Sequence, residues 1–90
     1  MLTITPQAAD MIEKLAGQAR LPLGAGLRIA SRADGPGLKM SFVPAPARGD
    51  RVLAPFNVTM FLDPVATVRL QHEVLDARSN RSGSAFFLQP

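Results

Sequence analysis

The stretch Val58-Thr59-Met60-Phe61-Leu62-Asp63-Pro64 decides the fold of this chain. Its apolar residues alternate in the way of a strand that turns one face to a core and leaves Phe61 on the other face. Asp63 can cap a following helix, and Pro64 suits the first helical position because the N–H that proline lacks has no partner there. The stretch therefore predicts a buried strand that runs directly into a helix. Its core-facing residues are expected to be Val58, Met60 and Leu62.

The same device occurs near the N-terminus, at Thr5-Pro6. Alternation over residues 2–5 predicts a short first strand, and a helix with an apolar stripe is expected to run from Pro6 to near Arg20. Further strands are predicted at 27–32, 38–42, 52–53, 75–77 and 85–88, separated by turns rich in Gly, Pro, Asn and Asp. The strands come in hairpins, and the helices do not join parallel neighbours. We therefore expect a single domain over residues 1–90, an α+β fold with a mostly antiparallel curved sheet or pseudobarrel of about seven short strands and two helices.

The composition excludes several classes of site. The chain has 90 residues, 47% of them hydrophobic and 19% charged, and it contains no Cys. A disulfide scaffold, a thiolate zinc site and a Cys-ligated cluster are therefore excluded. With one histidine, His72, a metal site made only of histidines is excluded as well. No serine or acidic residue has a recognisable catalytic partner in the sequence, so we expect no enzyme and no catalytic residue.

The charge pattern argues against nucleic acid and membrane partners. The net charge of +3 comes from cations spread along the chain, and the chain has no Trp or Tyr that could stack on a base. No apolar run approaches the roughly 18 residues that a membrane-spanning helix needs, and the N-terminal residues carry no signal-peptide pattern. We therefore expect a cytoplasmic protein.

Several short motifs, in this order and spacing, resemble the HesB/IscA family, the A-type carriers of iron–sulfur cluster assembly. They cover nearly the whole chain. They are the segments 2–9 (LTITPQAA), 26–29 (GLRI), 48–52 (RGDRV), 58–64 (VTMFLDP), 74–76 (VLD) and 85–87 (AFF). The resemblance implies a HesB-like domain that works in iron–sulfur assembly.

The sequence departs from that family at its cluster ligands. The resemblance implies three ligand cysteines, one in a Gly-rich turn and two in a C-terminal Cys-Gly-Cys. The turn equivalents here are Asp34, Gly35, Pro36 and Gly37, and the C-terminal pair has no counterpart. A serine hydroxyl would not replace a thiolate because it stays protonated near neutral pH. We therefore expect a cysteine-free relative with no cofactor and no metal ligands.

The leading functional hypothesis is a non-enzymatic accessory or interaction module linked to iron–sulfur assembly or iron handling. One alternative is a small-ligand or metal-binding module that uses the Gly35–Gly37 turn with Asp34 and His72. Another is a structural dimeric domain unrelated to iron–sulfur chemistry. We expect a homodimer, because two helices cover only part of such a sheet. Phe61 and Phe86, on strand faces opposite the core stripe, are the expected interface, and iron–sulfur assembly proteins are the expected partners.

Overall fold

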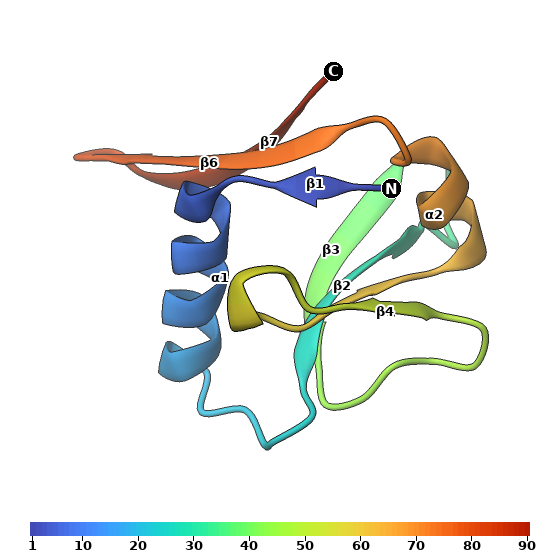
Figure 1. Ribbon diagram of the computed structural model, residues 1–90, viewed down its shortest axis with the longest axis horizontal. Helices are drawn as coiled ribbons and strands as arrows, with labels where there is room; N and C mark the ends of the chain where they lie inside the picture. The colour runs from blue at the N-terminus through green and yellow to red at the C-terminus, as the bar shows by residue number, and fades with distance from the viewer.

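The computed structural model describes residues 1–90 and arranges them as two small sheets with two helices (Figure 1). The helices are α1 (Pro6–Gln18) and α2 (Pro64–Arg69), and a short 3-10 turn, η1, spans Pro55–Asn57. The strands are β1 (Thr3–Ile4), β2 (Gly26–Ser31), β3 (Leu38–Val43), β4 (Arg51–Leu53), β5 (Met60–Leu62), β6 (Val74–Asn80) and β7 (Gly83–Gln89).

The strands form one sheet in the order β1-β6-β7 and another in the order β3-β2-β5-β4. The α+β class, the two helices and the seven strands are confirmed. The sheets are less antiparallel than expected, because β1 pairs with β6, and β2 with β5, in parallel. Local hairpin signals identify only strands that pair with their sequence neighbours, and both parallel pairings join strands far apart in the chain. The sheets are mixed and do not close into a barrel.

Both helices begin at the predicted caps. The Thr5 hydroxyl accepts a hydrogen bond from the Ala8 N–H at 3.1 Å, and the Asp63 carboxylate accepts one from the Ala66 N–H at 2.7 Å. Each cap satisfies a backbone donor that the first helical turn leaves free. α1 ends slightly earlier than predicted, because Arg20 adopts a left-handed conformation with φ at +52°.

The core lies between the two sheets, with α1 packed against the β6–β7 hairpin (Figure 1). Val58, Met60 and Leu62 are all buried there, as the alternation in the sequence predicts. The other buried members of this core come from β1, α1, β2, α2 and β6. They are Leu2, Ile4, Ala8, Ala9, Ile12, Leu27, Ile29, Ala66, Leu70, Leu75 and Ala77.

Phe61 is buried on the other face of its sheet. The ring is 1% exposed, so the expectation that it presents an interface is wrong. Phe61 stands opposite Arg28 in the β2–β5 register and opposite Val52 in the β4–β5 register, and the Arg28 side chain binds Asp50, the residue before β4. Gly26 lies beside the ring. Phe61 is therefore buried within the chain itself and needs no second chain to cover it.

Phe86, the other expected interface residue, is half-buried. It packs against the edge of the main core from β7. Phe86 therefore shares the core face of its sheet, as its register opposite the buried Ala77 requires.

The close approach at Gly26 generates a testable expectation. A Cβ at this position would lie 2.7 Å from the Thr59 carbonyl oxygen and 3.0 Å from a Phe61 ring carbon. Gly26→Ala should therefore lower the free energy of unfolding by about 1–3 kcal/mol. Gly17→Ala is the matched control, because nothing lies within 4 Å of its Cβ and the residue is helical, so it should raise stability by about 0.5–1 kcal/mol. Urea unfolding measures both; equal effects of the two substitutions would contradict the packing described here.

Candidate functional site

The turn at residues 32–37 joins β2 to β3 and contains Asp34, Gly35, Pro36 and Gly37, the residues expected to correspond to the family's ligand turn. The Arg32 N–H donates to the Gly37 carbonyl oxygen at 3.3 Å, and Gly37 has φ at +96°. The Asp34 carboxylate accepts two hydrogen bonds from the Arg32 guanidinium, at 3.0 and 3.1 Å. The hydrogen bonds from Arg32 are the main cause that holds the pKa of Asp34 below its usual range. The turn therefore presents an exposed ion pair and backbone, with no thiol.

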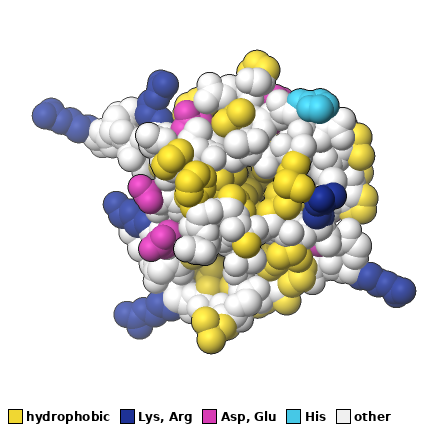
Figure 2. All heavy atoms as spheres, viewed as in Figure 1, with side chains coloured by type: hydrophobic (Ala, Val, Ile, Leu, Met, Phe, Trp, Pro, Cys, Tyr) yellow, Lys and Arg dark blue, Asp and Glu magenta, His cyan; other side chains and the backbone are white.

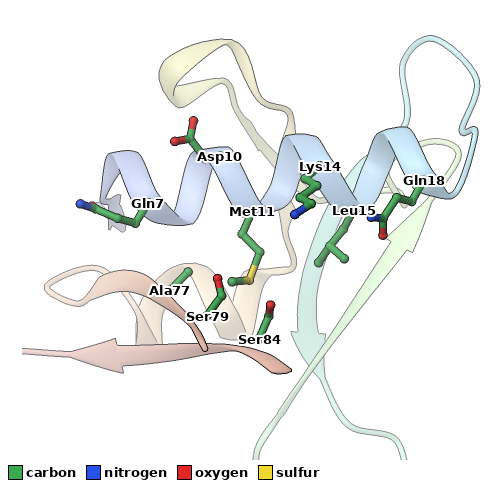
Figure 3. A pocket seen from close by; sticks show the side chains of 9 residues that line it. All are labelled: Gln7, Asp10, Met11, Lys14, Leu15, Gln18, Ala77, Ser79 and Ser84. Carbon is green, nitrogen blue, oxygen red and sulfur yellow. The ribbon is translucent and has the colours of Figure 1, made fainter. Parts of the chain in front are cut away.

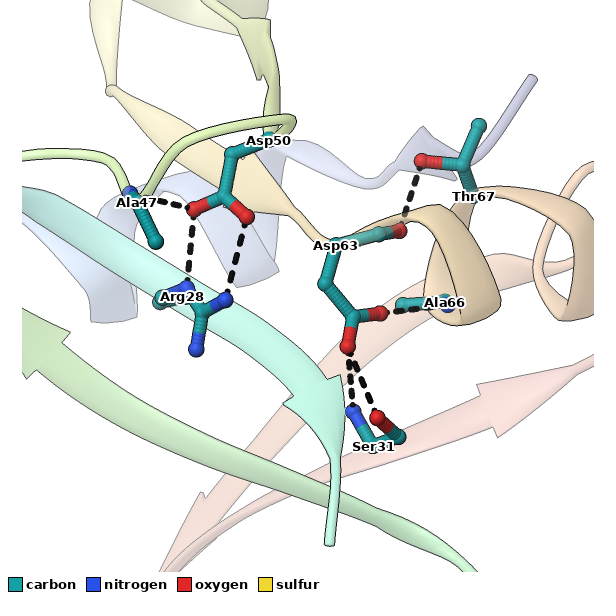
Figure 4. A network of polar contacts seen from close by, with 7 residues as sticks. All are labelled: Arg28, Ser31, Ala47, Asp50, Asp63, Ala66 and Thr67. Carbon is teal, nitrogen blue, oxygen red and sulfur yellow. Dashed lines mark hydrogen bonds and ion pairs between the residues drawn. The ribbon is translucent and has the colours of Figure 1, made fainter.

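The base of this turn is fixed by Asp63 (Figure 4). One carboxylate oxygen caps α2, and the other accepts hydrogen bonds from both the N–H and the hydroxyl of Ser31, each at 2.9 Å. The Asp63 N–H donates to the Ile29 carbonyl oxygen at 3.2 Å, and its own carbonyl accepts from the Thr67 hydroxyl at 2.9 Å. A single buried residue thus joins the end of β2, where the turn starts, to the end of β5 and the beginning of α2.

These contacts keep Asp63 ionised despite its burial. Desolvation acts to raise the pKa of the carboxyl, but the hydrogen bonds from Ala66 and Ser31 outweigh it, and the charge of Arg28 helps. The net result is a pKa of Asp63 below its usual range. Every polar side-chain atom buried in the chain has a hydrogen-bond partner, so both carboxylate oxygens of Asp63 are partnered within the structure.

A second carboxylate, Asp50, forms a bidentate ion pair with Arg28 (Figure 4). The guanidinium nitrogens lie 2.8 and 3.0 Å from the two carboxylate oxygens, and the Ala47 N–H donates to the same carboxylate at 2.8 Å. The hydrogen bond from Arg28 is the main cause that holds the pKa of Asp50 below its usual range. The sequence shows Asp50 only as part of a turn entering a strand, because its partner lies on a distant strand.

An apolar cavity of about 200 Å³ lies beside the turn, between the two sheets. Eight hydrophobic residues line it: Ile29, Leu38, Met40, Leu70, Leu75, Phe86, Phe87 and Leu88. Leu38 directly follows the turn, and Leu88 lies near the end of β7. Met40 and Leu88 are the exposed members of the lining. The cavity has no charged or metal-ligating side chain, so it suits an apolar group and not an ion.

A larger and more polar groove of about 440 Å³ runs between α1 and the turn end of the β6–β7 hairpin (Figure 3). Met11 points from the helix toward the hairpin, near Ser79 and Ser84. Leu15 also lines the groove, and polar side chains lie around it. The remaining lining residues are Gln7, Asp10, Lys14, Gln18 and Ala77.

The residues proposed for metal binding are not assembled into a site. No group of three or more His, Asp or Glu side chains lies close enough to hold an ion. His72 is exposed, and its Nε2 lies 3.3 Å from the side-chain nitrogen of Gln71 (Figure 2). The Asp76 carboxylate accepts hydrogen bonds from Thr5, Ala77 and Gln89. Neither helix is long and apolar enough to pass through a bilayer.

The Asp63 link generates the first expectation for this site. Asp63→Ala removes the helix cap, worth about 1 kcal/mol, and leaves the Ser31 N–H without its acceptor. The expected loss in the free energy of unfolding is about 2–4 kcal/mol. Asp34→Ala is the matched control, an exposed aspartate whose removal should change stability by less than about 0.5 kcal/mol. If Asp63→Ala unfolded at the same urea concentration as Asp34→Ala, the contacts of Asp63 would not contribute to the stability of the fold.

The lowered pKa values give an expectation for pH. Asp50 and Asp63 are stabilised as carboxylates in the folded state, so the folded chain binds their protons less readily than the unfolded chain does. Their contribution is complete above the ordinary aspartate pKa of about 4 and is lost as the pH falls through the lower folded values. Urea midpoints measured between pH 7 and pH 2 should therefore fall below about pH 4, and the fall should be shallower in Asp50→Asn. An equally steep fall in that variant would contradict the role of the Arg28 pair.

Comparison with known proteins bears on the fold. The sequence matches no family model, and no curated protein matches it in sequence. Among solved structures, Escherichia coli SufA, described as involved in the biosynthesis of iron–sulfur clusters, superposes with a TM-score of 0.78 at 24% identity, covering 98% of this chain and 83% of SufA. An Aquifex aeolicus protein gives 0.73 at 20% identity, covering 99% and 90%. IscA, in a structure with a [2Fe-2S] cluster, gives 0.67 at 19% identity, covering 99% and 81%.

These likenesses extend over nearly the whole chain, from β1 to β7, and so include the turn and the hairpin described above. At sequence identities of 19–24%, these likenesses establish the fold of the chain. The resemblance to the HesB/IscA family, first indicated by short motifs, is thereby confirmed for the fold. The chain has the fold of SufA and IscA, in a sequence that contains no cysteine.

Proposed function

We propose that this chain is a non-enzymatic HesB/IscA-like module that acts in iron–sulfur assembly or iron handling through contacts with other proteins. It does not hold a cluster itself. The observation that carries the proposal is the SufA fold over 98% of the chain, combined with a turn at 32–37 that offers an Asp34–Arg32 ion pair where a ligand would stand.

The chemistry of the turn supports a role without a cluster. Iron–sulfur clusters in proteins are held by thiolates, with histidine in some cases. The chain has no thiol, and its one histidine, His72, is not part of a group that could hold a metal ion. The Asp34 carboxylate is occupied by Arg32. What remains at this end of the molecule is an ordered backbone and an apolar cavity, which suit protein contact better than ligation.

The surface supports a role in binding. Exposed apolar side chains lie in the middle of the face shown in Figure 2, and Lys and Arg side chains project around its rim. Exposed large hydrophobic residues include Met40 and Leu88 beside the cavity. Self-association is part of the proposal, and since Phe61 is core, Phe86 on β7 is the remaining candidate among the two phenylalanines first expected to form the interface.

The proposal is tested by cluster transfer. Cluster-loaded SufA is mixed anaerobically with an apo-ferredoxin, and the visible circular dichroism of the acceptor cluster is followed with and without this chain. The expected result is a change of at least about threefold in the transfer rate, because a bound module would alter how carrier and acceptor meet.

The control is an equal concentration of an unrelated small basic protein, such as hen lysozyme, which tests whether positive charge alone has the effect. Equal rates with this chain, with lysozyme and with buffer would contradict the proposal. A visible cluster that moves onto this chain would contradict the statement that the chain does not hold a cluster itself.

A further inference from the structure

The outer edge of β7 is an open strand edge. β7 stands at the end of the β1-β6-β7 sheet and pairs only with β6. It is seven residues long, Gly83–Gln89, and the tip of its hairpin extends past α1 (Figure 1). An edge of this length presents a row of unpaired N–H and C=O groups to a further strand.

The backbone groups that point outward can be identified from the register. The Thr3 and Thr5 N–H groups donate to the carbonyls of Glu73, which directly precedes β6, and of Leu75, so the backbone groups of the odd-numbered residues along β6 point toward β1. The even-numbered residues of β6 therefore face β7, where Asp76 stands opposite Phe87 and Arg78 opposite Ala85. It follows that Ala85, Phe87 and Gln89 are bonded inward, and that the N–H and C=O groups of Ser84, Phe86 and Leu88 point away from the sheet.

The other edges of the two sheets are short or charged. β1 has two residues, and β4 has three, beginning with Arg51. β3 is longer but carries Lys39 in its interior. These are the devices by which sheet edges avoid pairing with other chains. β7 has none of them, because its sequence GSAFFLQ contains no charge and no proline.

The charge distribution favours a second copy of the chain as the occupant. The net charge of +3 opposes association of two copies, yet none of the charged residues lies between Gly83 and Pro90. Arg78, on the neighbouring strand β6, stacks on the Phe87 ring of its own hairpin, 5.3 Å from the ring centre, and Arg81 lies in the turn before β7. Two copies can therefore pair along β7 without placing like charges opposite each other.

Resting on the self-association included in the proposed function, we infer that two copies pair through β7, antiparallel about a twofold axis at Phe86. Ser84, Phe86 and Leu88 of one copy then meet Leu88, Phe86 and Ser84 of the other, and each donor finds an acceptor. The two three-stranded sheets become one six-stranded sheet, and the two Phe86 side chains lie side by side on its core face.

The hollows beside the edge fit this register. Ser84 lines the groove under α1, and Leu88 lines the apolar cavity. The twofold axis brings Leu88 of the second copy next to Ser84, where Met11 and Leu15 provide an apolar floor (Figure 3). An exposed leucine thereby moves from water to apolar surface in both copies.

Amide hydrogen exchange of the chain alone, followed by NMR over a range of concentrations, tests the inference. The Ala85 and Phe87 amides are bonded to β6 and should be protected at every concentration. The Phe86 and Leu88 amides should exchange freely at low concentration and become at least about tenfold slower where sedimentation shows a dimer. A chain that stays monomeric contradicts self-association and this inference together. A dimer in which the Phe86 amide stays unprotected contradicts this interface alone.

A proline substitution isolates the edge. Leu88→Pro removes an outward N–H and no bond to β6, so the hairpin is retained while the seam is blocked. It should weaken dimerisation at least about tenfold, and Leu88→Ala, which keeps the N–H, should weaken it less. A dimer of wild-type strength in Leu88→Pro would overturn the inference. If Leu88→Pro did not fold, the amide exchange of the wild-type chain would still show whether two copies pair through β7. None of these measurements involves a carrier, so the cluster-transfer result is independent.

Discussion

The Asp63 carboxylate is the contact on which the rest of this fold depends. It lies at the end of β5, caps α2 with one oxygen and holds the end of β2 with the other through Ser31. Three elements from different parts of the sequence therefore meet at one buried charge. Because all its bonds favour the ionised form, the carboxylate stays charged and fully partnered, and a neutral side chain could not replace it without leaving donors unsatisfied.

This arrangement explains how the turn at 32–37 keeps its position without a metal. Ser31 is the last residue of β2, so the Asp63 link fixes the chain where the turn begins. The Arg28–Asp50 pair ties the end of the 44–50 loop to β2 of the same sheet. The scaffold around the turn is thus held by buried polar contacts and packing between residues of the chain itself.

The sequence predicts those features that depend on local patterns. Thr5-Pro6 and Asp63-Pro64 mark both helix starts because capping is a contact between residues three apart. The core stripe of β5 follows from simple alternation. The alternation could not show that the opposite face is covered within the chain, so Phe61 was expected at an interface. The pair between Arg28 and Asp50, 22 residues apart, likewise has no local signal in the sequence. The parallel pairings were missed for the same reason. At the turn, the sequence shows that no thiol is present, but the Arg32 pair with Asp34 emerges only from the structure.

Anaerobic reconstitution with iron and sulfide, with SufA treated in parallel, tests the central claim most directly. The claim is that this chain keeps the fold of SufA and IscA while lacking the means to hold a cluster. After desalting, the account predicts no visible absorption and no stoichiometric iron or sulfide on the chain, while SufA retains both. Stoichiometric iron and sulfide with a visible spectrum on the folded chain would contradict it, because they would require ligands that its residues do not provide.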